Sequence, residues 1–235
     1  MPRIRDYVVS GTPEEISRCL TQMASDLESD ADQIEKMREL GDACLVLPGL
    51  LRCTARQLCI LNASANLPIE VAAGACRTVF EVNIHTRLVT TSPDRMREVQ
   101  SQAGYDEIEL IEGFLRLEDK QTSESVSRLR KRKADIEEIL KRHGLERPKD
   151  RKTRINIRDD AKAAGMQEEY SALYKFYSKY VHGSSWLIYR PDSHRDIPEF
   201  RGAFLIKTQL YAADTWQRIR QYALREPSSA SSQGQ

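Results

Sequence analysis

Three polar side chains, Tyr174, Ser178 and His182, recur every four residues close to the end of a predicted helix. Residues at i, i+4 and i+8 share one face of a helix. At about 100° per residue, Ser178 lies about 40° and Lys175 about 20° from His182 around the helix axis. Histidine exchanges protons near neutral pH, and a neighbouring hydroxyl or amine can assist it. The stripe therefore predicts an acid/base site, with His182, Ser178 and Lys175 as catalytic candidates and Tyr174 as a ligand contact.

The same stripe also has a purely structural interpretation. Gly183 follows His182 and is typical of a helix C-terminus, where the helix dipole favours a charged imidazole. The ring could then hydrogen-bond to Ser178 or to a backbone carbonyl. A serine-hydrolase triad is excluded, because the chain has no nucleophile elbow and no acid partner is evident on this helix.

A second polar stripe, Arg77 and Glu81, interrupts an apolar segment. Spacing of i, i+4 allows the two side chains to pair, and His85 lies at the edge of the same stripe. The pair could fix the register of a buried helix, or Glu81 could hold the Arg77 guanidinium towards a phosphate or carboxylate. In the second interpretation Arg77 and Glu81 are catalytic candidates and His85 is a ligand contact.

Positive charge is concentrated between residues 128 and 158, where thirteen Lys or Arg stand against five acids. The rest of the chain is acidic, since the total formal charge is only +1. A solvated, internally paired helix is one interpretation of this segment, and attraction to a phosphate backbone is the other. Recognition of single strands commonly requires aromatic residues among the basic ones, and no aromatic residue is interleaved in this segment. The nucleic-acid-binding candidates are Arg128, Arg130, Lys131, Arg132 and Lys133.

Apolar residues recur at helical spacing along most of the chain, and no strand pattern is evident. Thr12, Pro13 and Glu15 form a capping-box start, while Gly41 and Gly144 are typical helix ends. The prediction is an all-α protein, a single bundle of about seven to eight helices. The expected helices cover residues 12–41, 43–62, 66–90, 93–103, 105–143, 156–165, 167–182 and 199–224, with a loop at 186–198.

Composition along the chain predicts an N-terminal helical region at 1–62, a bundle carrying the polar motifs at 63–225, and a disordered tail at 226–235. The five cysteines are odd in number and form no C-x2-C pair, so we expect neither disulfides nor a metal site, and no cofactor. The most apolar stretch, 43–61, is interrupted by Pro48, Gly49 and Arg52. We therefore expect no membrane span and a cytoplasmic protein.

Residues 75–88, taken with 156–185, resemble an uncharacterised family of bacterial helical proteins. Its members pair an Arg-x3-Glu helix with a later Tyr-x3-Ser-x3-His helix end, matched here by Arg77 and Glu81 and by Tyr174, Ser178 and His182. That family implies no activity.

The arrangement is more remotely similar to HEPN domains, which are common in toxin and phage-defence systems. Many of these are metal-independent ribonucleases in which four to six residues separate an Arg from a following His, assembled across a dimer. The resemblance implies RNA or another phosphate-bearing ligand as a partner, and a homodimer. The chain departs from the pattern, because Lys175 stands in that window and Arg does not. Two hypotheses follow: a HEPN-like nuclease or nucleotide-acting enzyme, and a non-catalytic helical module that binds a protein or small ligand.

Overall fold

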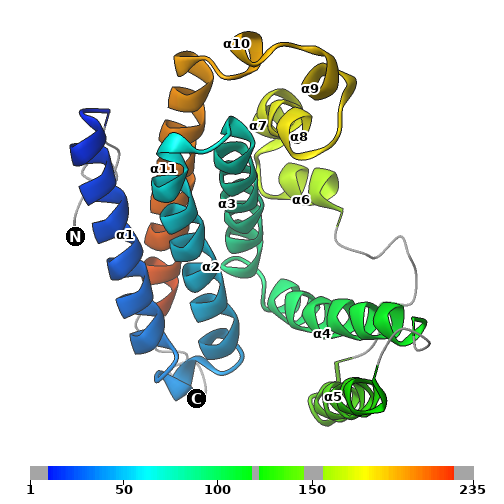
Figure 1. Ribbon diagram of the computed structural model, residues 1–235. Helices are drawn as coiled ribbons and strands as arrows, with labels where there is room; N and C mark the ends of the chain where they lie inside the picture. Colours follow the sequence, from blue (N-terminus) through cyan, green and yellow to red (C-terminus); the bar gives the residue numbers. More distant parts are fainter. Residues whose placement is uncertain (1–9, 118–121, 146–155, 225–235) are drawn as a thin grey trace, which may run out of the picture. The chain divides into compact units, whose positions relative to one another are not determined.

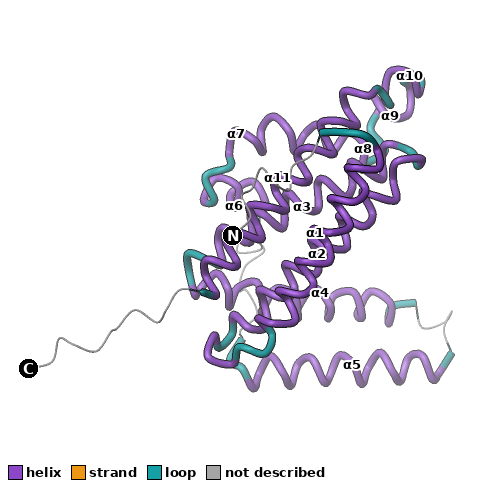
Figure 2. The backbone as a smooth tube through the Cα atoms, turned by 90° about the vertical axis from the view of Figure 1, so that its left-hand side faces the viewer, coloured by secondary structure: helices purple, strands orange, loops and turns teal. Residues whose placement is uncertain are grey.

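The computed structural model describes residues 10–117, 122–145 and 156–224, and Figure 2 shows that these residues form helices joined by loops and turns. Within them the protein is 85% helical without strands, and eight helices have seven or more residues. The predicted all-α fold is confirmed. The predicted disordered tail at 226–235 lies outside the described residues.

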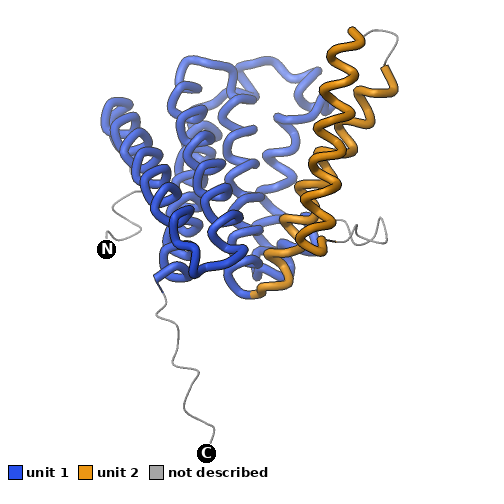
Figure 3. Tube along the Cα trace, turned by 90° about the horizontal axis from the view of Figure 1, so that it is seen from below, with its two compact units in different colours: residues 1–91, 157–235 blue, residues 92–156 orange. Residues whose placement is uncertain are grey.

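The chain divides into two compact units (Figure 3). The first combines residues 1–91 with 157–235, and the second is the intervening segment, Ser92–Asn156. Both polar stripes belong to the first unit and the basic segment mostly to the second. The expected domain boundary between residues 62 and 63 falls inside the first unit and stays a prediction.

The first unit begins with α1 (Pro13–Ile34), and its start follows the sequence closely. The Thr12 side chain accepts a hydrogen bond from the Glu15 backbone N–H, and the Glu15 carboxylate accepts one from Thr12, which is the predicted capping box. The expected end at Gly41 is wrong, because Met37 has non-helical dihedral angles. A separate turn of 3₁₀ helix, η2 (Arg38–Leu40), carries the chain to Gly41, whose positive φ of 57° suits glycine.

Three long helices form the framework beside α1: α2 (Ala43–Ala63), α3 (Ile69–Val89) and α11 (Pro198–Ala223). α1 packs on α2, and α3 packs on both α2 and α11 (Figure 1). Nearly every side of α3 is buried, which explains its weakly amphipathic sequence. Its polar side chains are therefore held among packed neighbours.

One apolar helical segment of the described chain, Ala43–Asn66, is long enough to cross a membrane by length and composition. Half of its most apolar window is buried inside the fold. Core helices of soluble proteins pass the same test, so this segment is consistent with a soluble protein.

A series of short helices begins the second part of the first unit, before α11: α6 (Ile157–Ala163), α7 (Gln167–Glu169), a π-helical turn (Tyr170–Tyr174) and α8 (Lys175–Val181). The expected loop at 186–198 is partly wrong, because it contains α9 (Ser185–Tyr189) and α10 (Asp192–Arg195). Aromatic rings join these pieces to the framework. Phe80 of α3 contacts Tyr177 of α8 and Tyr211 of α11, with ring centroids 6.2 and 5.1 Å apart.

The second unit contains α4 (Pro93–Leu115) and α5 (Ser123–Arg142). We expected a helix to stop before Gly104, but α4 continues through it. A Cβ added at Gly104 would lie 2.8 Å from a Leu140 methyl carbon, so the missing side chain permits close packing of the two helices. The expected continuous helix at 105–143 is also wrong, since α4 ends at Leu115 and Thr122 caps a new start.

Candidate functional site

Arg77 and Glu81 form an ion pair along α3, with 3.0 Å between Arg77 Nε and Glu81 Oε1. Their side chains are 19% and 32% exposed, because the flanking residues Cys76 and Phe80 are buried. The predicted i, i+4 pairing is therefore present. The ion pair is shielded from water on the side of these buried residues and is open to solvent on the other side.

Tyr174 completes this pair from the π-helical turn. Its hydroxyl accepts a hydrogen bond from Arg77 Nη2 at 2.6 Å and donates one to Glu81 Oε1 at 3.0 Å. The guanidinium carbon also lies 4.8 Å from the centre of the Tyr174 ring, a cation–π distance, and Tyr170 stacks against the same ring. Arg77, Glu81 and Tyr174 thus form a closed triangle of hydrogen bonds.

The π-helical turn changes how the Tyr174 stripe must be understood. A π turn closes i to i+5 hydrogen bonds, so the regular 100° spacing does not carry from Tyr174 into α8. Such turns are frequent at functional sites. No glycine or proline in the sequence indicates this π-helical turn. The expectation that Tyr174, Ser178 and His182 share one face of a regular helix therefore did not include it.

His182 reaches the triangle from the far end of α8. It is the C-cap residue and has extended dihedral angles, φ −109° and ψ 151°, so its side chain departs from the helical stripe. Its Nε2 lies 2.7 Å from Arg77 Nη1, although the two residues are 105 positions apart. The imidazole is exposed, and this contact forms the open edge of the site.

The Arg77–His182 contact indicates which nitrogen of the imidazole ring carries the proton. A guanidinium can only donate hydrogen bonds, so Nε2 must accept. The ring tautomer that makes this hydrogen bond carries its proton on Nδ1.

The neighbouring groups stay in fixed protonation states. Burial raises the pKa of the Tyr174 hydroxyl, and the negative charge of Glu81 raises it further. Burial lowers the pKa of the Arg77 guanidinium, but the hydrogen bond and charge of Glu81 outweigh it, and the net shift is upward. A neutral phenol and a permanent cation therefore flank the exposed imidazole.

The remaining predicted site residues lie at or near the triangle without all joining it. Ser178 is half-buried on α8, and its side chain is not among the groups that bond Arg77 in the described part of the chain. Lys175 is exposed at the start of α8. His85 is half-buried, one turn beyond Glu81 on α3.

A second polar network on α3 has no counterpart in the sequence expectations. The fully buried Asn83 amide donates to the Tyr211 carbonyl, Asp214 Oδ2 and Thr215 Oγ1 of α11, at 3.2, 2.9 and 3.1 Å. Arg87 donates to Asn83 Oδ1, and both Arg87 and Arg218 pair with Asp214 at 2.9 Å. The one sequence signal is an asparagine within an apolar run.

The basic segment lies on α5, where much of its charge is locally paired. Arg132 forms two hydrogen bonds with Glu107, at 2.7 and 3.1 Å, and Lys133 pairs with Glu112 at 2.7 Å. Arg128 lies 3.8 Å from Glu124. Arg130 and Lys131 are exposed on the same helix. Nucleic-acid binding by this segment stays a prediction.

The described residues also contain a groove that does not belong to the Arg77 site. A groove of about 690 Å³ has a mostly apolar lining from α1, α2, α3 and α11, including Leu20, Leu61 and Leu205, and none of the four site residues lines it. No group of three or more His, Cys, Asp or Glu in the described ranges is placed to hold a metal ion. The candidate site is therefore a surface site built from one arginine, one carboxylate, one phenol and one imidazole.

Comparison with known proteins identifies a family without a known activity. The model of a family of unknown function, DUF5677, matches residues 56–196, which include all four site residues. No curated protein and no solved structure matches the chain. The expected resemblance to a family of unknown function is confirmed. The Arg-x3-Glu and Tyr-x3-Ser-x3-His motifs as features of that family, and the HEPN resemblance, stay predictions.

Proposed function

Because the chain belongs to this family of unknown function, its activity must be argued from the site, and we propose that the Arg77–His182 site cleaves RNA without a catalytic metal. The single observation that carries the proposal is the 2.7 Å contact between Arg77 Nη1 and His182 Nε2. It joins the two polar motifs at an exposed position. A neutral imidazole beside a fixed guanidinium suits proton removal next to a phosphate.

In the proposed reaction, a phosphate oxygen takes the place of His182 as a partner of Arg77 Nη1. His182 Nε2 is then released to accept the proton of a ribose 2′-hydroxyl. The 2′-oxygen bonds to phosphorus while the bond from phosphorus to the 5′-oxygen breaks, and water protonates the leaving oxygen. The products are a 2′,3′-cyclic phosphate and a 5′-hydroxyl, and the imidazolium returns its proton to solvent.

Arg77 stabilises the negative charge that develops on the phosphoryl oxygens. Glu81 and Tyr174 position the guanidinium by bonding Nε and Nη2, which leaves Nη1 towards the open edge. Three bonds at fixed directions hold an arginine more firmly than a lysine could be held. Glu81 and Tyr174 are thus positioning residues in this proposal.

The choice of RNA comes from the HEPN resemblance. Those domains place Arg shortly before His on one helix, whereas here Arg77 comes to His182 from a different helix. We extend the proposal to a cytoplasmic, homodimeric component of a bacterial defence or stress system, with Ser178 and Lys175 close enough to the site to contact substrate.

The test is incubation of end-labelled RNA with purified protein in EDTA. We expect fragments ending in 2′,3′-cyclic phosphate, and a loss of about 10²–10⁴-fold in rate for His182→Ala, the usual contribution of acid/base catalysis. His143→Ala is the matched control, because His143 is also an exposed C-cap histidine, on α5. Equal cleavage by wild type and His182→Ala, or no cleavage by either, would overturn the proposal.

The second candidate function is a non-catalytic helical module that binds a protein or small ligand. The closed triangle of Arg77, Glu81 and Tyr174 favours it, since it joins α3 to the π-helical turn as a structural clamp would. A purely structural role for His182 predicts that His182→Ala lowers stability. Intact folding together with loss of a cellular phenotype would contradict that role.

A further inference from the structure

The exposed face of α8 carries unpaired positive charge beside His182. Tyr177 and Tyr180 face the core, while Lys175 and Lys179 are exposed one turn apart and lead towards His182. Neither lysine has an ion-pair partner within the described part of the chain. Two ammonium groups are therefore available to an anion along this face.

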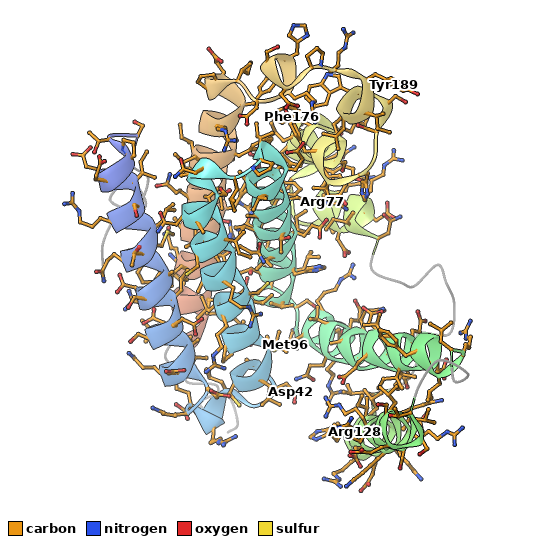
Figure 4. All side chains as sticks on the ribbon, in the orientation of Figure 1. Asp42, Arg77, Met96, Arg128, Phe176 and Tyr189 are labelled. Carbon is orange, nitrogen blue, oxygen red and sulfur yellow. The ribbon has the colours of Figure 1, made fainter. Side chains whose placement is uncertain are left out.

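The next element, α9, begins three residues after His182 and exposes apolar side chains. Ile188 is 64% exposed and Tyr189 is 81% exposed. Tyr189 is labelled at the outer end of α9 in Figure 4, above Arg77 in that view. Val181, the residue before His182, is 42% exposed. Exposed aliphatic and aromatic side chains thus lie on both sides of His182 along the chain.

Short helices with exposed apolar residues need anchoring, and α9 has it. The Ser184 hydroxyl accepts a hydrogen bond from the Leu187 backbone N–H at 3.2 Å and donates one to the Lys179 carbonyl at 2.9 Å. Trp186 packs edge-on against the buried Tyr180, with ring centroids 4.9 Å apart. Tyr189 is therefore presented to solvent from a fixed support.

The contrast with α5 identifies the more suitable binding surface. On α5, Arg132 and Lys133 are already paired with Glu107 and Glu112 of α4. On α8 and α9, Lys175, Lys179 and Arg190 are exposed without such partners in the described chain. Surfaces that bind single strands combine basic residues along the backbone with aromatic rings on which bases stack. Of these two surfaces, only the one on α8 and α9 combines unpaired basic residues with an exposed aromatic ring.

We infer that the α8–α9 face binds single-stranded RNA, with phosphates on Lys175 and Lys179 and an unpaired base stacked on Tyr189. This inference rests on the proposed function and specifies how that site holds its substrate. A duplex keeps its bases stacked inside the helix, so Tyr189 could not reach their faces. The site is therefore selective for unpaired RNA.

The test measures binding separately from cleavage. A fluorescent single-stranded oligonucleotide with 2′-O-methyl riboses cannot undergo the proposed reaction, so its fluorescence anisotropy reports affinity alone. We expect Tyr189→Ala to weaken binding about tenfold, typical of one lost base stack, and Tyr189→Phe to retain it. We expect a duplex of the same sequence to bind more weakly than the single strand.

Matched lysine variants test the charge contribution. Lys179→Ala should weaken binding and reduce its salt dependence, whereas Lys131→Ala on α5 should change little. The inference is overturned if wild type does not bind the single strand, if Tyr189→Ala binds like wild type, or if Lys131→Ala has the larger effect. Circular dichroism should confirm that each variant is folded.

This result is independent of the cleavage assay. If Tyr189-dependent binding occurs without RNA cleavage, the binding surface stands and the proposed reaction fails. If His182-dependent cleavage occurs but Tyr189→Ala binds normally, the reaction stands and the inference about α8 and α9 fails.

Discussion

Two polar clusters lie on the same helix, α3, and they differ in what surrounds them. The Asn83 cluster joins α3 to α11, two long helices, and the asparagine side chain is completely buried. The Arg77 cluster joins α3 to a π-helical turn and a short helix, and it ends at an exposed histidine. Both satisfy their polar groups. Only the second leaves a reactive nitrogen at the surface, which is why it is the candidate for chemistry.

The largest expected effect on stability comes from opening the buried cluster. Asn83→Ala removes the donor to three acceptors and leaves Arg87 with one partner fewer. We expect a loss of about 2–3 kcal/mol in the free energy of unfolding, because buried groups lose their partners. Urea denaturation checks this, and a loss below about 0.5 kcal/mol would show that the network is not needed for stability.

Acid sensitivity should reside in the same cluster. Burial raises the pKa of the Asp214 carboxyl, but hydrogen bonds from Arg218 and Asn83 and the charge of Arg87 outweigh it, and the net pKa is lower than that of an ordinary aspartate. A lowered folded-state pKa contributes stability that is present above the unfolded value and lost as pH falls through the folded value. Asp214→Asn should lower stability at neutral pH by about 1–2 kcal/mol.

Stability measured against pH distinguishes this effect from general acid unfolding. The difference between wild type and Asp214→Asn should shrink as pH falls below about 4, where the Asp214 carboxyl of the unfolded chain begins to be protonated while that of the folded protein stays ionised. A constant difference across that range would mean that Asp214 acts by shape and not by charge.

A smaller effect is expected at the Arg77 triangle. Tyr174→Phe keeps the ring under the guanidinium but removes the hydroxyl that bridges Arg77 and Glu81. We expect about 1 kcal/mol of destabilisation, since water can replace the bond at this half-open position. Thermal and urea unfolding of this variant beside Asn83→Ala would rank the two clusters directly. A larger cost for Tyr174→Phe would reverse the comparison.

The smallest expected effect on stability belongs to His182→Ala. The imidazole is exposed and its contact with Arg77 lies at the surface, so the free energy of unfolding should change by less than about 0.5 kcal/mol. Nitrogen-15 NMR of the neutral wild-type ring should find its proton on Nδ1. A ring protonated on Nε2 in the neutral form would contradict the geometry described for Arg77.

Local rules predicted the features that depend on near neighbours. Thr12 and Glu15 form a capping box within four residues, and Gly144 ends α5 with a positive φ of 62°. The continuation of α4 through Gly104 could not be found this way. Its reason is Leu140, on another helix.

The site shows the same division. The Arg77–Glu81 pair follows from helical spacing alone, whereas the contact of Arg77 with His182 joins residues 105 positions apart. This contact also requires an extended C-cap and a π-helical turn, and no glycine or proline in the sequence indicates that turn. Asn83 was missed because its partners on α11 lie about 130 positions away, at separations of 128, 131 and 132.

The first unit combines two separate segments of the chain, 1–91 and 157–235, and this has a consequence for synthesis on the ribosome. At about 5–20 residues per second, the 105 positions that separate Arg77 from His182 take on the order of ten seconds to be made. During that time α3 has emerged while its later partners α8 and α11 have not. The nascent chain therefore carries apolar surface that a chaperone can recognise, and the contact between Arg77 and His182 can form only after residue 182 has been translated.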